Sequence, residues 1–168
     1  TKLITTMNYL LFGGQPDSGK TSTVTRLTNE LILPPFLFTV ADGIFPPARG
    51  TDFLILLQRI FNGQNQCIIV NSPSDDAPAI NNLRDFIVKH SDKNIDIVVS
   101  SVRDIGWERN HFFTTLKINP TDANVFEIPL ARVTRRHTSG LFAPAMSWYE
   151  NTVDRLVNFV ITHPPFNL

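Results

Sequence analysis

The sequence predicts an α/β domain in which a mainly parallel five-stranded sheet lies between two layers of helices, a three-layer α/β/α sandwich. Short apolar runs alternate along the chain with segments whose apolar residues recur at helical spacing. Each run is too uniformly apolar for a half-solvated strand, which is typical of parallel strands covered on both faces. At 168 residues, the chain has the size expected of one compact domain over residues 1–168.

The individual elements follow from these patterns, taken in chain order. The runs predicted to form strands are residues 9–12, 36–41, 67–70, 95–100 and 124–130. Amphipathic spacing and breaker residues predict helices over residues 21–33, 51–61, 79–90, 107–116 and 147–161. The first helix is expected to stop before Pro34, because proline at that point cannot continue it.

Polar or glycine-rich segments follow the predicted strands. They are residues 14–21, Asp42, and residues 71–76, 100–109 and 132–137. Ligands of parallel sheets bind beyond the carboxyl ends of the strands, so these segments are the expected site.

Composition excludes several classes of function. Fifteen basic residues balance fifteen acidic ones, so no overall field attracts the chain to nucleic acid or to an anionic membrane. The apolar runs fall well short of the length that spans a bilayer, so no membrane partner is expected. A single cysteine, Cys67, lies in an apolar run and predicts a buried thiol rather than a disulfide, which fits a cytoplasmic protein.

The most informative segment follows the first predicted strand. Residues 14–21 match G-x-x-x-x-G-K-[ST] at every fixed position, with Gly14, Gly19, Lys20 and Thr21 at those positions. Glycines at both ends allow the backbone N–H groups to point inward and form a concave anion site. The helix that begins near Gly19 adds the positive end of its dipole at the same point.

A strand, a glycine loop and a helix in this order make the chain similar to the P-loop NTPases. The resemblance implies a P-loop NTPase fold, with ATP and Mg²⁺ as cofactors. It further implies that Lys20 contacts the outer phosphates and that the Thr21 hydroxyl ligates Mg²⁺. The residues expected to contact the nucleotide are Gly14, Gln15, Pro16, Asp17, Ser18, Gly19, Lys20, Thr21 and Ser22.

Three acidic residues are candidates beside this loop. Asp42 ends the second predicted strand, where it would face the phosphates or an acceptor, or simply form an Asp-Gly turn. The position at which the family usually carries a Walker B carboxylate is Asn71, so either Asp75 reaches back to the metal or Asp42 takes the role. Asp75 and Asp76 are equally suited to cap the following helix.

Arginines supply the remaining candidates. Arg103 and Arg109 follow the fourth predicted strand, where kinases of this layout carry an arginine-bearing lid, although surface salt bridges are an equal alternative. Arg135 and Arg136 belong to the basic cluster Arg132–His137, which suits stacking on adenine. A nucleic-acid patch or a solvated loop are the alternatives for that cluster.

Two main functions agree with these residues. The first is a Mg²⁺-dependent small-molecule or nucleotide kinase, with catalytic Lys20, Asp42, Arg103 and Arg109 and an unidentified acceptor. The second is a dimerising ATPase switch similar to ParA and MinD, suggested by Asn71-Ser-Pro73, although that family's signature lysine is replaced by Gln15. A nucleotide-binding module without turnover is a third hypothesis. An N-K-x-D motif is absent, which favours ATP over GTP.

Overall fold

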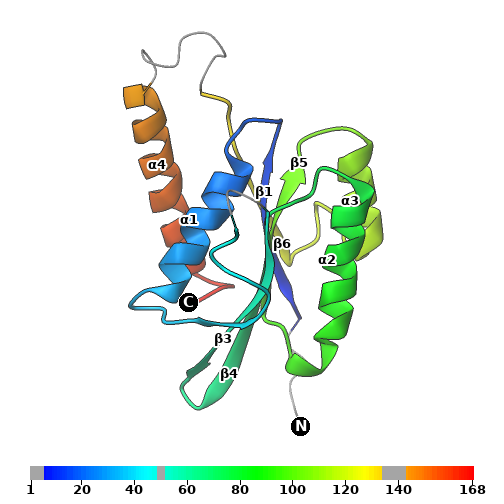
Figure 1. The fold of residues 1–168 in the computed structure, drawn as a ribbon, viewed down its shortest axis with the longest axis vertical. Helices are drawn as coiled ribbons and strands as arrows, with labels where there is room; N and C mark the ends of the chain where they lie inside the picture. Colours follow the sequence, from blue (N-terminus) through cyan, green and yellow to red (C-terminus); the bar gives the residue numbers. More distant parts are fainter. Residues whose placement is uncertain (1–5, 49–51, 134–142) are drawn as a thin grey trace.

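The protein, described here by a computed structural model over residues 6–48, 52–133 and 143–168, contains one six-stranded mixed sheet (Figure 1). Its strands are β1 (Asn8–Gly14), β2 (Thr39–Asp42), β3 (Leu54–Phe61), β4 (Gln64–Asn71), β5 (Ile97–Arg103) and β6 (Val125–Pro129). The order across the sheet is β2-β3-β4-β5-β1-β6. Strands β4, β5, β1 and β6 pair in parallel, whereas β2 with β3 and β3 with β4 pair antiparallel.

Helices cover both faces of this sheet. The helices are α1 (Lys20–Ile32), α2 (Ala77–Lys89), α3 (Trp107–Leu116) and α4 (Ala143–Ile161), with a short 3-10 helix, η1 (Ser91–Lys93), after α2. Figure 1 shows α1 and α4 together on one side of the sheet and α2 and α3 on the other. The α/β class and the three layers predicted from the sequence are therefore confirmed.

Alternate residues of the central strands supply two separate cores. In β1, Leu10 and Phe12 pack in the cluster beneath α1 and α4, while Tyr9 and Leu11 pack in the cluster beneath α2 and α3. Successive side chains of a strand point to opposite faces, so a strand covered on both sides must be apolar throughout. This explains why the central strands appear in the sequence as unbroken apolar runs.

The predicted helix over residues 51–61 is wrong, because Leu54–Phe61 forms strand β3. This strand and β4 make a hairpin joined by Asn62-Gly63, in which both residues have positive φ, at 51° and 74°. Asn-Gly between two apolar runs is the preferred sequence of a two-residue hairpin turn. The sheet therefore has six strands and an antiparallel portion, rather than five mainly parallel strands.

The remaining elements lie close to their predicted positions. Helix α3 has the predicted bounds, while α1 and α2 are offset by one or two residues and α4 begins four residues earlier. Strand β2 begins three residues later than predicted. Within the described part of the chain, no helix is long and apolar enough to cross a membrane.

Asp42 does not lie beside the glycine loop. It ends β2, the outermost strand, and β3, β4 and β5 separate that strand from β1. Its Oδ2 accepts hydrogen bonds from Lys89 Nζ at 2.7 Å and from His90 Nε2 at 2.8 Å, and its Oδ1 accepts one from the Gly43 amide. The carboxylate thus fastens the edge strand to the end of α2, which replaces the predicted role at the phosphates.

These contacts make part of the free energy of unfolding depend on pH. Hydrogen bonds from Lys89 and then His90 lower the pKa of Asp42 from 3.8 to about 2. A carboxylate whose pKa is lowered in the folded state stabilises it above the unfolded pKa, and this contribution is lost as pH falls from about 4 to about 2. We therefore expect Asp42→Asn to cost stability at neutral pH, with a difference from wild type that shrinks over this interval. Urea unfolding at a series of pH values measures it, and a constant difference would contradict the assignment.

Candidate functional site

The loop between β1 and α1 turns back sharply over residues 15–19. Asp17 and Gly19 both have positive φ, at 62° and 82°, and Gly19 is the residue that precedes the first turn of α1. The Gly19 carbonyl accepts the Thr23 amide at 2.9 Å, so the helix begins immediately after the loop. Because the first amides of a helix have no partner within it, this end of α1 presents N–H donors and a positive dipole to the loop.

Two glycines are required by the packing at the end of β1. A Cβ atom on Gly13 would collide with the Glu127 carboxylate, and one on Gly14 would collide with Ser18 Oγ. Gly14 is the first residue of the predicted motif. Glycine is needed here because Ser18 packs against it, since its φ is not in the left-handed region. The Ser18 side chain is buried, and its Oγ has no hydrogen-bond partner among the described residues.

Lys20 is folded against the loop that precedes it. Its buried ammonium group donates to the Gly14 carbonyl at 2.9 Å and to the Gln15 carbonyl at 3.0 Å. Burial lowers the pKa of Lys20, an effect that the nearby Asp75 carboxylate opposes and the Arg103 guanidinium reinforces. Among the described residues no carboxylate lies within 4 Å of this ammonium, so two neutral carbonyls hold a cation that lacks a direct counter-ion.

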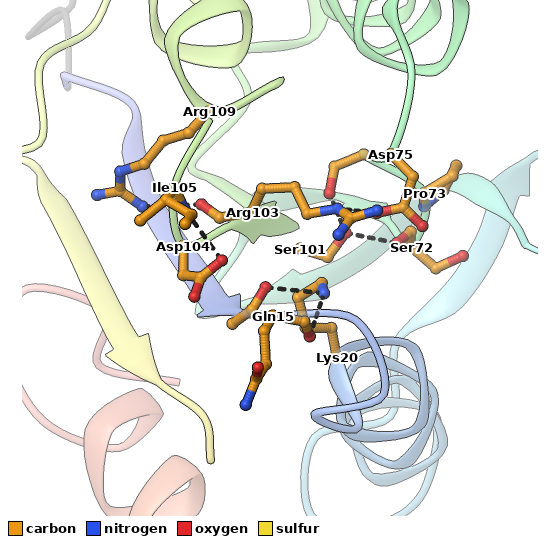
Figure 2. A network of polar contacts seen from close by, with 12 residues as sticks. Gln15, Lys20, Ser72, Pro73, Asp75, Ser101, Arg103, Asp104, Ile105 and Arg109 are labelled. Atoms are coloured by element: carbon orange, nitrogen blue, oxygen red, sulfur yellow. Dashed lines mark hydrogen bonds and ion pairs between the residues drawn. The ribbon is translucent and has the colours of Figure 1, made fainter. Parts of the chain in front are cut away.

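Three of the predicted segments meet at one pocket of about 300 Å³. Figure 2 shows Lys20, Ser72, Asp75 and Ser101 gathered around the extended side chain of Arg103. The pocket is lined by Pro16, Asp17, Gly19, Lys20, Thr21, Ser22, Ser72, Asp75 and Ser101. Parallel pairing of β4, β5 and β1 produces this meeting, since it brings the ends of those strands to the same edge.

Ser72 and Ser101 were missed by the sequence analysis, which placed Asn71 at this position. Val70 packs in the cluster beneath α1 and Ile69 in the cluster beneath α2, so Asn71 continues toward α2 while Ser72 lines the pocket. The Asn71 amide donates instead to Ser100 Oγ at 3.0 Å and to the Pro73 carbonyl. Strand alternation was the signal that identifies Ser72.

Buried serine hydroxyls connect the ends of β4 and β5. Ser101 Oγ donates to the Ser72 carbonyl at 2.5 Å and lies 2.8 Å from Ser74 Oγ, while Ser100 Oγ donates to the Ser101 carbonyl at 2.8 Å. Such a network fixes side chains that would otherwise rotate freely. The wall of the pocket opposite the glycine loop is therefore rigid and rich in hydroxyl groups.

The two neighbouring aspartates have separate tasks. Asp76 caps α2, its Oδ1 accepting the Ala79 amide at 2.8 Å. Asp75 lines the pocket, and its Oδ1 accepts a hydrogen bond from Arg103 Nε at 2.8 Å. The helix-cap hypothesis thus holds for Asp76, while the structure places Asp75 and Arg103 together at the mouth of the pocket.

Arg109 is directed away from the pocket. Its two terminal nitrogens donate to the Glu127 carboxylate at 2.6 and 2.8 Å, and its guanidinium lies 4.9 Å from the centre of the Phe113 ring. Figure 2 shows its guanidinium on the opposite side from that of Arg103. The pairing with Glu127 raises the pKa of Arg109 and joins α3 to β6. We therefore assign Arg109 to the framework, in place of the predicted lid.

A second cavity of about 240 Å³ adjoins the first, because Asp17, Gly19 and Ser22 line both. Its far wall comes from α4 and from the segment after β6, where the Tyr149 hydroxyl accepts the Ala131 amide at 2.8 Å. Ser18 also lines it, while its unpartnered Oγ is buried against Gly14. Arg135 and Arg136, predicted to contact a base, lie outside the described residues, although Arg132 reaches within 3.9 Å of Asp17.

The side-chain atoms of the first pocket that could ligate a metal ion are oxygen atoms. Of the predicted metal ligands, Thr21 and Asp75 line the same pocket, whereas Asp42 is distant. Within the described ranges, no three His, Cys, Asp or Glu side chains gather as a metal cluster. Mg²⁺ usually takes one or two protein ligands and completes its shell with phosphate and water, so this donor set fits that ion better than a soft metal.

Comparison with protein-family models, with curated protein sequences and with solved structures gave no match for this chain.

The packing at Gly14 predicts a specific rescue. We expect Gly14→Ala to lower the free energy of unfolding by about 1–3 kcal/mol, because its Cβ overlaps Ser18 Oγ. The double variant with Ser18→Gly removes the obstructing atoms and should recover most of that loss. Gly63→Ala is the control: its Cβ meets nothing within 4 Å, so only its positive φ costs about 1 kcal/mol. Urea unfolding measures each variant, and no recovery in the double variant would refute the contact.

Proposed function

We propose that the chain is a P-loop NTPase that binds Mg²⁺-ATP and cleaves its terminal phosphoanhydride bond. The observation that carries the proposal is the convergence on one pocket of the helix α1 terminus, the Lys20 ammonium, the Asp75 carboxylate and Arg103. Amide donors and a cation suit phosphate oxygens, and the carboxylate beside them suits a divalent metal.

Lys20 is suited to exchange its present acceptors for phosphate. Its hydrogen bonds now go to two neutral carbonyls, those of Gly14 and Gln15. Charge-assisted hydrogen bonds to phosphate are roughly twice as strong as bonds between neutral groups. A phosphate in the pocket would also raise the pKa of Lys20, which burial now lowers, so binding relieves an unfavourable interaction.

Thr21 and Asp75 are the residues that would hold Mg²⁺, with phosphate and water completing its shell. When bound, this ion neutralises charge on the outer phosphates. The rigid serine network then keeps the opposite wall of the pocket in place while the nucleotide binds.

Arg103 supplies the second positive charge. Its Nε is paired with Asp75. The guanidinium keeps its charge at any physiological pH and can hold developing negative charge on the phosphoryl group. In this proposal Asp75 orients Arg103 toward the pocket before the nucleotide arrives.

The adjoining cavity suits the nucleoside. It shares residues with the phosphate pocket, and the Tyr149 ring with the Val133 and Met146 side chains offers an apolar surface for a base.

The acceptor for the phosphoryl group is proposed to be water. Asp42, expected beside a small-molecule acceptor, is paired with Lys89 and His90, and Arg109, expected in a lid over the phosphoryl group, is paired with Glu127. A binding module without turnover is the second candidate. It is favoured by Ser72, which lines the pocket at the end of β4 where a carboxylate would ordinarily face the metal.

Lys20→Ala tests the phosphate site. We expect Mg²⁺-ATP affinity, measured by isothermal calorimetry, to fall by more than about tenfold, because the charged partner of the outer phosphates is lost. Lys93→Ala is the matched control, since Lys93 is an exposed lysine of η1. Equal affinity of the Lys20 variant and wild type would refute the site.

Asp75→Asn separates turnover from binding. We expect ATP affinity within about threefold of wild type and hydrolysis lower by about 100-fold, because metal and Arg103 are no longer held in place. Asp76→Asn is the neighbouring control, since asparagine caps a helix as well as aspartate does. Phosphate release measured against Mg²⁺ concentration decides the result. Binding without hydrolysis by the wild type would support the module, and unchanged hydrolysis by Asp75→Asn would remove Asp75 from the mechanism.

A further inference from the structure

The tip of the β3–β4 hairpin carries an open groove of about 710 Å³, which we call the hairpin groove. The segment that leads into β2, the last residues of β3 and the turn into β4 line it. Figure 1 shows β3 and β4 extending together to the lower left of the molecule, below α1. Because β3 runs antiparallel to β4, this tip lies at the opposite edge of the sheet from the pocket that contains Lys20.

Strand β2 stops short of this tip. Its first residue, Thr39, pairs with Gln58, so residues 59–61 of β3 have no strand on that side among the described residues. The chain before Thr39 turns away instead, because Leu37 has a φ of 58° and the Phe38 amide bonds to a carbonyl of α1. The sheet therefore has an open edge at the hairpin groove.

The Ile60 backbone faces that open edge. Across the hairpin from Gln58, Cys67 directs its backbone N–H and C=O away from β3, to Asp96. The Gln58 backbone therefore points toward β2, where its carbonyl accepts the Thr39 hydroxyl at 3.2 Å. Backbone direction in a strand repeats every second residue, so Ile60 points the same way, beyond the end of β2. Within the described ranges its N–H and C=O thus lack a strand partner.

Arg59 places an uncompensated charge in the same groove. All fifteen Asp and Glu residues of the chain lie within the described ranges, and none of them forms an ion pair with Arg59. Its guanidinium donates to the Gln66 side chain at 2.7 Å and to the Phe36 carbonyl at 2.8 Å, while Nη2 is buried without a partner among the described residues. It lies 4.5 Å from the centre of the Phe38 ring and 4.7 Å from that of Phe61. The surroundings of this cation are therefore neutral, and the groove favours an anionic ligand.

We propose that the hairpin groove binds an extended peptide segment of a partner protein, with an acidic side chain that pairs with Arg59. The residue opposite Ile60 would exchange two backbone hydrogen bonds with it, as a short added strand. The next residue of that segment lies on the face of the sheet that carries Arg59, so its carboxylate can reach the guanidinium. The exposed Ile60 and Phe61 side chains add apolar contact.

Two observations favour this occupant over others. A small carboxylate would pair with Arg59 but leave the Ile60 backbone without a partner, whereas a strand uses both. The segments of this chain outside the described ranges contain no Asp or Glu, so the acidic residue belongs to another molecule. The groove lies away from the nucleotide pocket, and its test is independent of the proposed function.

Isothermal calorimetry with the capped peptide acetyl-STVEVTS-amide tests the groove. We expect a dissociation constant on the order of 100 µM, since two backbone bonds, one ion pair and a few apolar contacts are gained. The same peptide with glutamine in place of glutamate should bind at least about tenfold more weakly. Equal affinity of the two peptides, or no binding of the first at about 1 mM, would overturn the proposal.

Arg59→Gln tests the cation from the protein side. We expect affinity for the glutamate peptide to fall by at least about tenfold, to the level of the glutamine peptide. Arg84→Gln is the matched control, because Arg84 is an exposed arginine of α2 that does not line the groove. Thermal unfolding verifies that each variant is folded. The comparison of the two peptides on the wild-type chain needs no variant, so it decides the charge pairing even where Arg59→Gln lowers stability.

A peptide methylated on both valine nitrogens tests the added strand. The methyl groups remove the N–H donors on either side of the glutamate but leave its charge, so binding should weaken by at least about tenfold whichever way the strand runs. N-acetylglutamate amide, which offers the carboxylate alone, should also bind at least about tenfold more weakly than the peptide. If either probe binds as tightly as the parent peptide, the groove is a site for a charged group without a strand, and the proposal is wrong.

Discussion

Parallel pairing of β4, β5 and β1 is the constraint on which the candidate site depends. Gly14 aligns with Arg103, and Asn71 aligns with Ser100, three residues earlier, so the three strands run in one direction and end at the same edge of the sheet. The loops that follow must then diverge from the same edge. This is why Lys20, Asp75 and Arg103, which are far apart in the sequence, line or border one small pocket.

The charged groups in and beside that pocket make it suited to an anionic ligand. A buried ammonium lies in a pocket lined by the carboxylates of Asp17 and Asp75, and the Arg103 guanidinium pairs with Asp75 at its mouth. Burial already disfavours the charged form of Lys20, and an anionic ligand would reverse that effect. The proposed nucleotide would place its negative charge directly against the Lys20 ammonium, which now contacts only two neutral carbonyls.

Several site residues show why sequence reasoning succeeds in part. Arg103 and Arg109 are equivalent in the sequence, since both are cations after the fourth predicted strand. In the structure Arg103 pairs with Asp75, whereas Arg109 pairs with Glu127 of β6, which lies beside β1. Asn71 and Ser72 differ by one position, yet strand alternation directs them to opposite faces. For the two arginines, the deciding partner comes from an element distant in the chain.

The sequence by itself determined the α/β class, the four helices of the described chain and the glycine loop, because helical periodicity, apolar runs and a fixed spacing of glycine and lysine are local properties. Even β3 was encoded locally, by Asn62-Gly63 between two apolar runs. Only the tertiary structure decided that β2 lies at the outer edge, that Asp42 contacts α2 and that Ser72 and Ser101 line the same pocket as Lys20. These outcomes depend on strand order and on which side chains meet across the sheet, and neither is a property of any single segment.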